Sequence, residues 1–216
     1  MNRRMLLWWG VSCLLAATAL GSIVVLGFGD TPAIDHWWNT VVIDQRAPWV
    51  IDFAHVLNFA GGSSGTIFVI APLLIVGLLL TRRWRSAAFA VTAMVTSALA
   101  VQALKQLFGR ARPADMLVAS DYGSFPSGHV ANAATIALVI WVIFPRVWTA
   151  LLGALWVLGM AYSRTLLSVH WATDTLGGAL TGAGAVLLVA ALLSDWVQGR
   201  NPPSDPPIVW EAPRPS

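Results

Sequence analysis

Charged residues are what this sequence has least of. Only 11% of its 216 residues are charged, whereas 57% are hydrophobic, and soluble globular domains carry about 25% charged residues. The apolar runs reach the length of about 18 residues at which a helix can cross a bilayer. The composition therefore disfavours a soluble domain and predicts an all-α fold that crosses a membrane several times.

Lysine, glutamate and cysteine are each represented by one residue, namely Lys105, Glu211 and Cys13. A single cysteine excludes an intrachain disulfide and leaves the redox compartment open. The net charge of +3 comes from 13 basic and 10 acidic residues. Because they form no dense basic run, we expect no nucleic-acid partner.

Six apolar segments are predicted to form helices. They cover Leu6–Phe28, Thr66–Leu80, Ser86–Phe108, His129–Phe144, Trp148–Tyr162 and Thr173–Val197. We predict a six-transmembrane-helix bundle in one integral membrane domain, residues 1–199, and a disordered, proline-rich cytoplasmic tail, residues 200–216. A cleavable signal peptide is the alternative for the first segment, but the apolar stretch continues through Phe28 and disfavours it.

Arginine positions predict the orientation of the bundle, because basic residues gather on the cytoplasmic side. In a six-span arrangement one side holds Arg3, Arg4, Arg82, Arg83, Arg85, Arg146, Arg200 and Arg214. We therefore predict a multi-pass protein of the plasma membrane with both termini in the cytoplasm. The opposite side holds Arg46, Lys105, Arg110, Arg112 and Arg164. Charges kept there against the insertion bias are candidates for function.

Residues 29–65 are predicted to form a long outer loop, rich in aspartate and tryptophan. This composition fits a segment that lies on the membrane interface. It equally fits a packed external cap without a role in chemistry, which is the interpretation we favour. We expect His36 and His55, both in this loop, to serve the cap or the interface.

Three short motifs on the outer side concentrate polar residues that apolar helices usually lack. They are KQLFGRARP from Lys105 to Pro113, PSGH from Pro126 to His129, and SRTLLSVHWATD from Ser163 to Asp174. Each motif lies at the end of a predicted helix. A helical bundle can bring such ends together although they are separate in the sequence.

The cations and small residues of these motifs suit a phosphate group. Lys105, Arg112 and Arg164 supply positive charge and many hydrogen-bond donors, which match the oxygens of a phosphoryl group in transfer. Ser127 and Gly128 are predicted to begin a helix, where backbone N–H groups and the helix dipole attract an anion. The motifs therefore predict an anion cradle.

Two histidines and one aspartate add catalytic chemistry. His170 and Asp174 are four residues apart, which on a helix places them on the same face. The carboxylate can keep one imidazole nitrogen protonated and leave the other free to attack phosphorus. His129 can then donate a proton to the leaving oxygen. This chemistry requires no metal ion or other cofactor, and no metal-ligand cluster occurs outside the motifs.

Each motif alone has a plainer interpretation. His170 and Asp174 can be an ordinary i,i+4 pair, and the PSGH motif can be ordinary helix-start chemistry. Arg110 and Arg112 can simply contact lipid headgroups. All of these would have to hold at once on the same membrane face, and we disfavour that coincidence.

The eleven motif residues resemble, without a departure, the signature of the type 2 phosphatidic acid phosphatase superfamily. That signature is Lys, six residues, Arg-Pro; then Pro-Ser-Gly-His; then Ser-Arg, five residues, His, three residues, Asp. It spans Lys105 to Asp174, and the six-helix layout extends the resemblance to nearly the whole chain except the tail.

The resemblance implies a role for each motif residue. His170 is expected to be the nucleophile, Asp174 its orienting partner and His129 the general acid. Phosphate binding is expected from Lys105, Arg112, Ser127, Gly128 and Arg164, with support from Pro113, Pro126 and Ser163. Arg110 falls in the variable part of the first motif and is left as a candidate headgroup contact.

We therefore expect a metal-independent hydrolase of a membrane lipid phosphate or diphosphate, active on the extracytoplasmic face. The resemblance implies undecaprenyl diphosphate as the first candidate substrate, followed by phosphatidylglycerol phosphate or phosphatidic acid. A phosphotransferase with the same intermediate and a non-catalytic lipid-phosphate binding or transport protein stay open as alternatives. A vanadate haloperoxidase shares the signature but is soluble, so the predicted spans disfavour it. The sequence indicates no oligomeric state.

Overall fold

A computed structural model describes residues 2–27, 31–62 and 65–197. The tail predicted for residues 200–216 lies outside these ranges. Every regular element within them is helical. The elements are α1 (Arg3–Ser22), η1 (Ile23–Gly27), α2 (Ala33–Ile43), α3 (Pro48–Gly61), η2 (Thr66–Ile70), α5 (Ala71–Leu80), α6 (Trp84–Phe108), α7 (Gly128–Ile143), α8 (Val147–Leu166) and α9 (Ala172–Val197). The prediction of an all-helical protein is confirmed.

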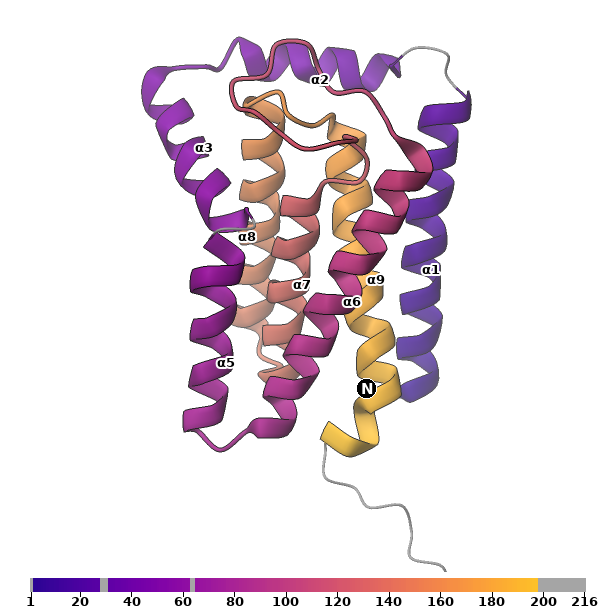
Figure 1. The fold of residues 1–216 in the computed structure, drawn as a ribbon, viewed down its shortest axis with the longest axis vertical. Coiled ribbons are helices and arrows are strands. Elements are labelled where there is room, and N and C mark those ends of the chain that lie inside the picture. The colour runs from indigo at the N-terminus through magenta and orange to yellow at the C-terminus, as the bar shows by residue number, and fades with distance from the viewer. Residues whose placement is uncertain (1, 28–30, 63–64, 198–216) are drawn as a thin grey trace, which may run out of the picture.

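The six predicted apolar segments coincide with helices of the structure. The third is typical: it was predicted to begin at Ser86 and end at Phe108, and α6 covers Trp84–Phe108. Residues 29–65 differ from the predicted loop, because their described part forms α2 and α3. Figure 1 shows α2 lying across one end of the bundle as a helical cap. Pro48 in the first turn of α3 helps that helix to begin, since it needs no N–H partner there.

Three helices in the described residues are long and apolar enough to cross a membrane: Arg3–Gly27, Trp84–Phe108 and Ala172–Leu193. A fourth span results if Pro48–Gly61 and Thr66–Leu80, which meet at a bend of 56°, act as one. α7 is apolar but has only 16 residues, fewer than the 20 or so that usually span a bilayer. The prediction of six spans is therefore met in part by length and hydropathy.

α9 lies at the centre of the bundle, where it packs against α1, α6 and α7. Glycine allows its close approach to α7: a Cβ atom on Gly178 would lie 2.4 Å from the backbone oxygen of Ser127. Small residues permit such approaches between membrane helices. The backbone N–H of Ser127 also donates to the carbonyl of Asp174 at 3.0 Å. The start of α7 and the first turn of α9 are thereby joined directly.

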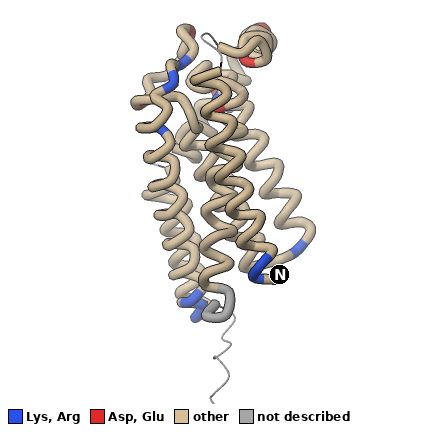
Figure 2. Tube along the Cα trace, turned by 90° about the vertical axis from the view of Figure 1, so that its right-hand side faces the viewer, with Lys and Arg blue, Asp and Glu red and all other residues tan. Residues whose placement is uncertain are grey.

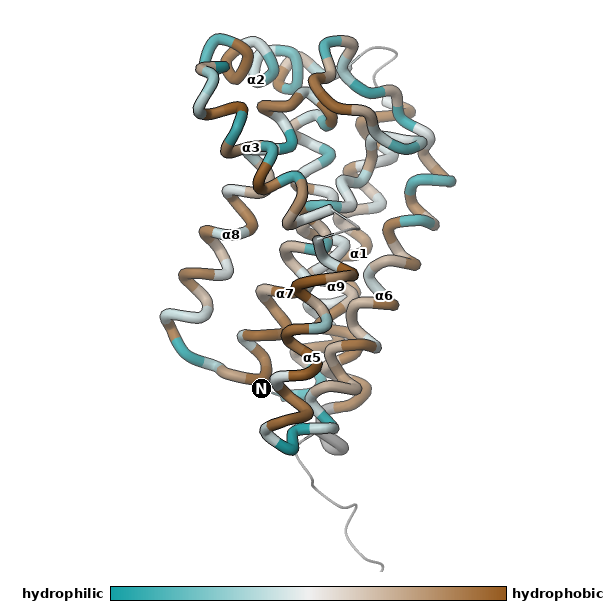
Figure 3. The backbone as a smooth tube through the Cα atoms, turned by 60° about the vertical axis from the view of Figure 1, so that its left-hand side comes forward, coloured by the Kyte–Doolittle hydropathy of each residue, from teal (hydrophilic) through white to brown (hydrophobic). Residues whose placement is uncertain are grey.

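Charged residues gather at the two ends of the bundle and leave a long apolar middle. Figure 2 shows Lys and Arg at both ends, with the N-terminus at the end opposite the cap. Figure 3 shows the hydrophobic stretches of α5 and α7 between those ends, and more hydrophilic segments near α2. This distribution matches a bundle that is surrounded by lipid along its middle.

Candidate active site

The three motifs meet at the end of the bundle that α2 covers. The first ends α6, where Gly109 takes a φ of +52°, a left-handed conformation that suits glycine at a helix C-terminus. The second begins α7 at Gly128, as predicted. The third runs from the last turns of α8, which ends at Leu166, into α9. Segments that are distant in the sequence thus form one cluster.

His170 is buried, and backbone contacts fix its ring. Its Nδ1 lies 2.7 Å from the carbonyl oxygen of Ser124, and since a carbonyl only accepts, Nδ1 must carry the proton. Nε2 then keeps its lone pair and lies 3.3 Å from Nη1 of Arg112. Burial lowers the pKa of His170 to about 4, although Asp174 opposes this effect. The imidazole is therefore neutral at neutral pH, as a nucleophile requires.

Asp174 lies in the first turn of α9, whereas His170 precedes that helix, which begins at Ala172. The two residues therefore do not share a helix face in the way their spacing predicted. The connecting turn still brings Oδ2 of Asp174 to 3.6 Å from Nδ1 of His170. Oδ2 also accepts from the backbone N–H of Trp171 at 2.8 Å. Ser124 is thus the nearer partner of the histidine, and Asp174 the second.

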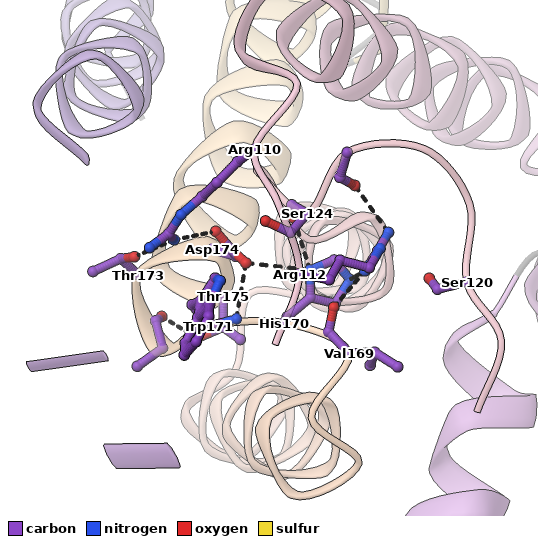
Figure 4. Close-up of polar contacts among 12 residues, drawn as sticks. Arg110, Arg112, Ser120, Ser124, Val169, His170, Trp171, Thr173, Asp174 and Thr175 are labelled. Atoms are coloured by element: carbon purple, nitrogen blue, oxygen red, sulfur yellow. Dashed lines mark hydrogen bonds and ion pairs between the residues drawn. The ribbon is translucent and has the colours of Figure 1, made fainter. Parts of the chain in front are cut away.

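Arg110, which the sequence left as a candidate headgroup contact, is buried at the other side of Asp174. Its Nη1 donates to Oδ1 of Asp174 at 2.6 Å and to Oγ1 of Thr173 at 2.8 Å. Its Nη2 donates to Oδ2 of Asp35 on α2 at 2.7 Å. Figure 4 shows Arg110 extended toward Asp174 and Thr173, while Arg112 reaches His170 and Val169. A side chain of the predicted loop, Asp35, therefore takes part in the cluster.

Lys105 and Arg112, both predicted phosphate ligands, converge on the carboxylate of Asp121. Nζ of Lys105 lies 3.1 Å from each carboxylate oxygen, and Nη2 of Arg112 lies 2.8 Å from Oδ1. Both cations also donate to the carbonyl of Gly123, and Arg112 to that of Val169. Burial raises the pKa of the Asp121 carboxyl, but Lys105 and Arg112 outweigh it and hold that pKa below its ordinary value. An anion therefore already lies between the two cations.

Arg164 and Ser127 carry two buried polar atoms without a hydrogen-bond partner in the described part of the chain. These atoms are Nε of Arg164 and Oγ of Ser127. The guanidinium of Arg164 is held from one side, where Nη1 donates to Oδ1 of Asn58 at 2.5 Å. Unsatisfied buried donors are costly in a folded protein. Both atoms belong to residues predicted to bind phosphate, and phosphate oxygens could satisfy them.

His129 occupies the second position of α7, next to Gly128. Its Nε2 lies 3.2 Å from the carbonyl of Asn58, so this nitrogen carries the ring proton. Asn58 thus contacts both His129 and Arg164, which links α3 to two predicted site residues.

The predicted supporting residues lie around this cluster. Ser163 donates from Oγ to the carbonyl of Ala54 at 3.1 Å and so joins α8 to α3. Pro113 and Pro126 are buried in the connection between α6 and α7. In the cap, the ring of His36 packs edge-on against Trp171 at 5.5 Å, and His55 is exposed on α3.

A cavity of about 540 Å³ opens beside these residues. Its polar wall includes Lys105, Asp121, His129 and His170, and its apolar wall includes residues of η2, α6 and α7. The apolar residues that line it are Ile67, Ala71, Met94, Val95, Ala98, Val101, Ala119 and Ile136. The described residues contain no group of three or more His, Cys, Asp or Glu side chains that could hold a metal ion. The site thus combines cations, imidazoles and an apolar slot.

Three residues of the site could not be identified from the sequence motifs. Ser124 acts through its backbone carbonyl, which the residue type does not reveal. Asp121 lies in an irregular connection outside the three motifs. Asp35 was one of several aspartates in a segment expected to be a loop.

Comparisons with known proteins agree with this geometry. The profile of the PAP2 superfamily matches residues 86–198, more than half of the chain, including all three motifs. An undecaprenyl-diphosphatase of Sulfolobus acidocaldarius is 36% identical over 64 residues, which cover 30% of each protein. A lipid A 1-phosphatase of Rhizobium johnstonii is 32% identical over 116 residues, covering 47% of this chain and 45% of that protein. The chain thus spans less than half the length of these two relatives.

A solved structure is similar over a larger part of the chain. The crystal structure of a transmembrane PAP2 type phosphatidylglycerolphosphate phosphatase from Bacillus subtilis matches with a TM-score of 0.71 and 25% identity. The match covers 88% of this chain and 96% of that one. The helical arrangement described above is therefore similar to that of a membrane enzyme.

Proposed function

The chain belongs to the PAP2 superfamily, and from that membership we propose that it is a phosphatase that hydrolyses a lipid phosphate or diphosphate through a phosphohistidine. The observation that carries the proposal is the tautomer of His170. Ser124 holds the proton on Nδ1, so the lone pair of Nε2 lies beside Arg112, a cation suited to hold the attacked phosphoryl group.

The proposed reaction has two displacements. In the first, Nε2 of His170 forms a bond to phosphorus while the bond from phosphorus to the leaving oxygen breaks. In this step His129 acts as an imidazolium, protonated on both ring nitrogens, and gives its Nε2 proton to that oxygen. In the second, water attacks phosphorus, its proton passes to His129, and the bond from nitrogen to phosphorus breaks. Inorganic phosphate leaves and both histidines return to their first state.

His129 must change partners to act as the acid. Its proton-bearing Nε2 contacts the carbonyl of Asn58, and the reaction requires that proton to reach the leaving oxygen. Lys105, Arg112 and Arg164 would hold the phosphoryl oxygens, together with Ser127 and Gly128 at the start of α7. Phosphate would replace Asp121 between Lys105 and Arg112, and would satisfy the unpartnered atoms of Arg164 and Ser127.

The cavity supports a lipid as the substrate, because its polar wall continues into an apolar slot between η2, α6 and α7. We propose that the protein crosses the plasma membrane six times, through α1, η2 with α5, α6, α7, α8 and α9, so that the substrate enters the slot from the bilayer. Arg3 begins α1, and Arg83 and Arg146 directly precede α6 and α8. These helices begin at the end of the bundle opposite α2 (Figure 1), which supports a cytoplasmic location for that end. The active site would then face the extracytoplasmic side.

Undecaprenyl diphosphate is the substrate that we place first, followed by phosphatidylglycerol phosphate. Two similar proteins support both, since one is an undecaprenyl-diphosphatase and the other a phosphatidylglycerolphosphate phosphatase. A comparison of kcat/KM over purified undecaprenyl diphosphate, phosphatidylglycerol phosphate and phosphatidic acid tests this order. A higher kcat/KM for either of the other lipids contradicts it.

Replacement of His170 tests the proposed function itself. The His170→Ala variant should fold and release no phosphate, because it lacks the nucleophile. His55→Ala is the matched control: this histidine is exposed on α3, and its loss should leave activity unchanged. Brief reaction of the wild type with labelled substrate should leave label on His170 that acid removes and alkali does not. Phosphate release by His170→Ala at a rate near that of the wild type would falsify the proposal.

A further inference from the structure

Asp174 is held from the side opposite His170 by a closed set of buried polar contacts. Asp174 and Asp35 both have an exposed fraction of 0%, and Arg110 between them has 8%. Each arm of the guanidinium binds one carboxylate, at 2.6 Å to Asp174 and 2.7 Å to Asp35. Thr173 completes the set, since its N–H and Oγ1 both donate to Asp35, at 2.9 and 2.6 Å. Two buried anions thus depend on one cation.

We propose that Arg110 and Asp35 are positioning residues for the reaction of His170. Arg110 keeps the Asp174 carboxylate ionised and fixes its distance from the imidazole, and Asp35 fixes Arg110. A buried carboxylate needs a partner cation to stay charged, and in a catalytic triad the carboxylate aligns the histidine and stabilises its cationic form. The phosphohistidine would be such a cation. This inference rests on the proposed function.

A half-buried arginine at the same end, Arg46, provides the contrast. Arg46 donates to Oδ2 of Asp115 at 3.1 Å and to the carbonyl of Leu166 at 2.9 Å. It also joins the α2–α3 cap to the rest of the bundle, but its partner carboxylate is 37% exposed and none of its hydrogen bonds reaches Asp174 or His170. Both arginines connect the cap to the rest of the bundle, but only Arg110 donates a hydrogen bond to the carboxylate beside the nucleophile.

The test compares Arg110→Gln, Arg110→Lys and Arg46→Gln in the full-length protein in detergent. Arg110→Gln should lower kcat by about 10- to 100-fold, the range found for residues that orient a catalytic ligand, with KM changed less than about threefold. Arg110→Lys keeps the positive charge but cannot pair with both carboxylates as the guanidinium does, so its kcat should lie between those of Arg110→Gln and the wild type. Arg46→Gln should lower the unfolding temperature less than Arg110→Gln does, because its partner carboxylate is partly exposed, and should leave kcat within about twofold.

The pH profile separates positioning from a structural role. Asp174 faces Arg110 from the α6–α7 connection and His170 before α9, and Arg110 links it to Asp35 on α2. The more distant charges of Lys105 and Arg112 also act on it. Without Arg110, Asp174 takes up a proton at a higher pH, so the acid limb of kcat/KM should move upward. Arg46→Gln should not move it.

Asp35→Asn keeps the side-chain shape and removes only the charge. It should lower kcat by about 3- to 10-fold in the wild-type background and have no further effect in Arg110→Gln. If Arg110→Gln does not fold, this variant and Arg110→Lys decide the question. The inference is overturned if their kcat and acid limb equal those of the wild type, or if Arg46→Gln loses as much kcat. An active His170→Ala variant would instead contradict the proposed function, so the two failures are distinguishable.

Discussion

Arg110 and Arg112 are two residues apart in one irregular segment, yet their surroundings differ in kind. Arg110 is paired with two carboxylates that are fully buried. Arg112 is paired with Asp121, whose side chain is 62% exposed and which lines the cavity. A buried pair cannot exchange partners without leaving a charge unpaired in the interior. An anion that binds from the cavity, by contrast, can replace an exposed carboxylate.

The difference indicates that Arg110 and Arg112, although both lie in the first motif, have different roles. In the proposed mechanism Arg112 is the cation available to a phosphate, whereas Arg110 is paired with Asp174. Substitutions of the two should therefore change different kinetic constants. Loss of Arg112 should weaken both substrate and transition-state binding, whereas loss of Arg110 should weaken only the chemical step.

The largest effect is expected from Arg112→Gln. Removing a cation that faces the developing charge costs about 10²- to 10³-fold in rate, and KM should rise as well because the same cation binds the ground state. Steady-state kinetics on the lipid substrate measures both constants. If Arg112→Gln leaves KM unchanged and lowers only kcat, as predicted for Arg110→Gln, the distinction between the two arginines is wrong.

The second effect concerns the acid limb of kcat/KM, which the two arginines influence through different groups: Arg112 through the pKa of His170 and Arg110 through the pKa of Asp174. Burial lowers the pKa of His170 to about 4, and the charge of Arg112 contributes to that shift, whereas Arg110 is not among its causes. The neutral ring is the proposed reactive form, so kcat/KM should stay constant as the pH falls from 7 and decrease only near pH 4. At pH 5 an unshifted histidine with a pKa of about 6.5 would be only about 3% neutral, a loss of about 30-fold.

A profile of kcat/KM between pH 4 and 8 measures this acid limb. The wild type should keep more than half of its activity at pH 5, and Arg112→Gln should lose activity at a higher pH than the wild type. A wild-type limb near pH 6.5 contradicts the assignment of a buried, neutral nucleophile.

The smallest effect is expected from Asp121→Asn, and it has the opposite sign. This carboxylate competes with phosphate for Lys105 and Arg112, so its neutralisation should tighten the binding of vanadate or inorganic phosphate. One exposed ion pair is worth at most about 1 kcal/mol, which corresponds to about fivefold in an inhibition constant. Asp115→Asn, on the same connection but paired with Arg46, is the control and should change nothing. Weaker vanadate binding by Asp121→Asn would show that Asp121 arranges the cations rather than competing for them.

The helices could be predicted from the sequence because a long apolar segment in a bilayer must form its backbone hydrogen bonds internally, and a helix does so. The sequence favoured a packed cap but did not predict its helices, since α2 mixes Asp35, His36 and two tryptophans with apolar residues and only its packing shows which face is buried. The side chains of the signature could be predicted to lie together from their resemblance to a family. The partners that orient them could not: Ser124 acts through its backbone, and the Arg110 contacts depend on the position of α2.

The direct contact between Ser127 and Asp174 has a consequence for how such proteins diversify. The N–H of Ser127 and the close approach at Gly178 fix the start of α7 to α9. The polar groups at the ends of these two helices therefore keep a fixed position relative to one another. α5, which continues from η2 along the slot, packs mainly on α6 and takes no part in that junction. Mutations in η2 and α5 can therefore change which lipid chain binds in the slot without disturbing the catalytic groups. Substrate specificity can then evolve through variants that all remain active.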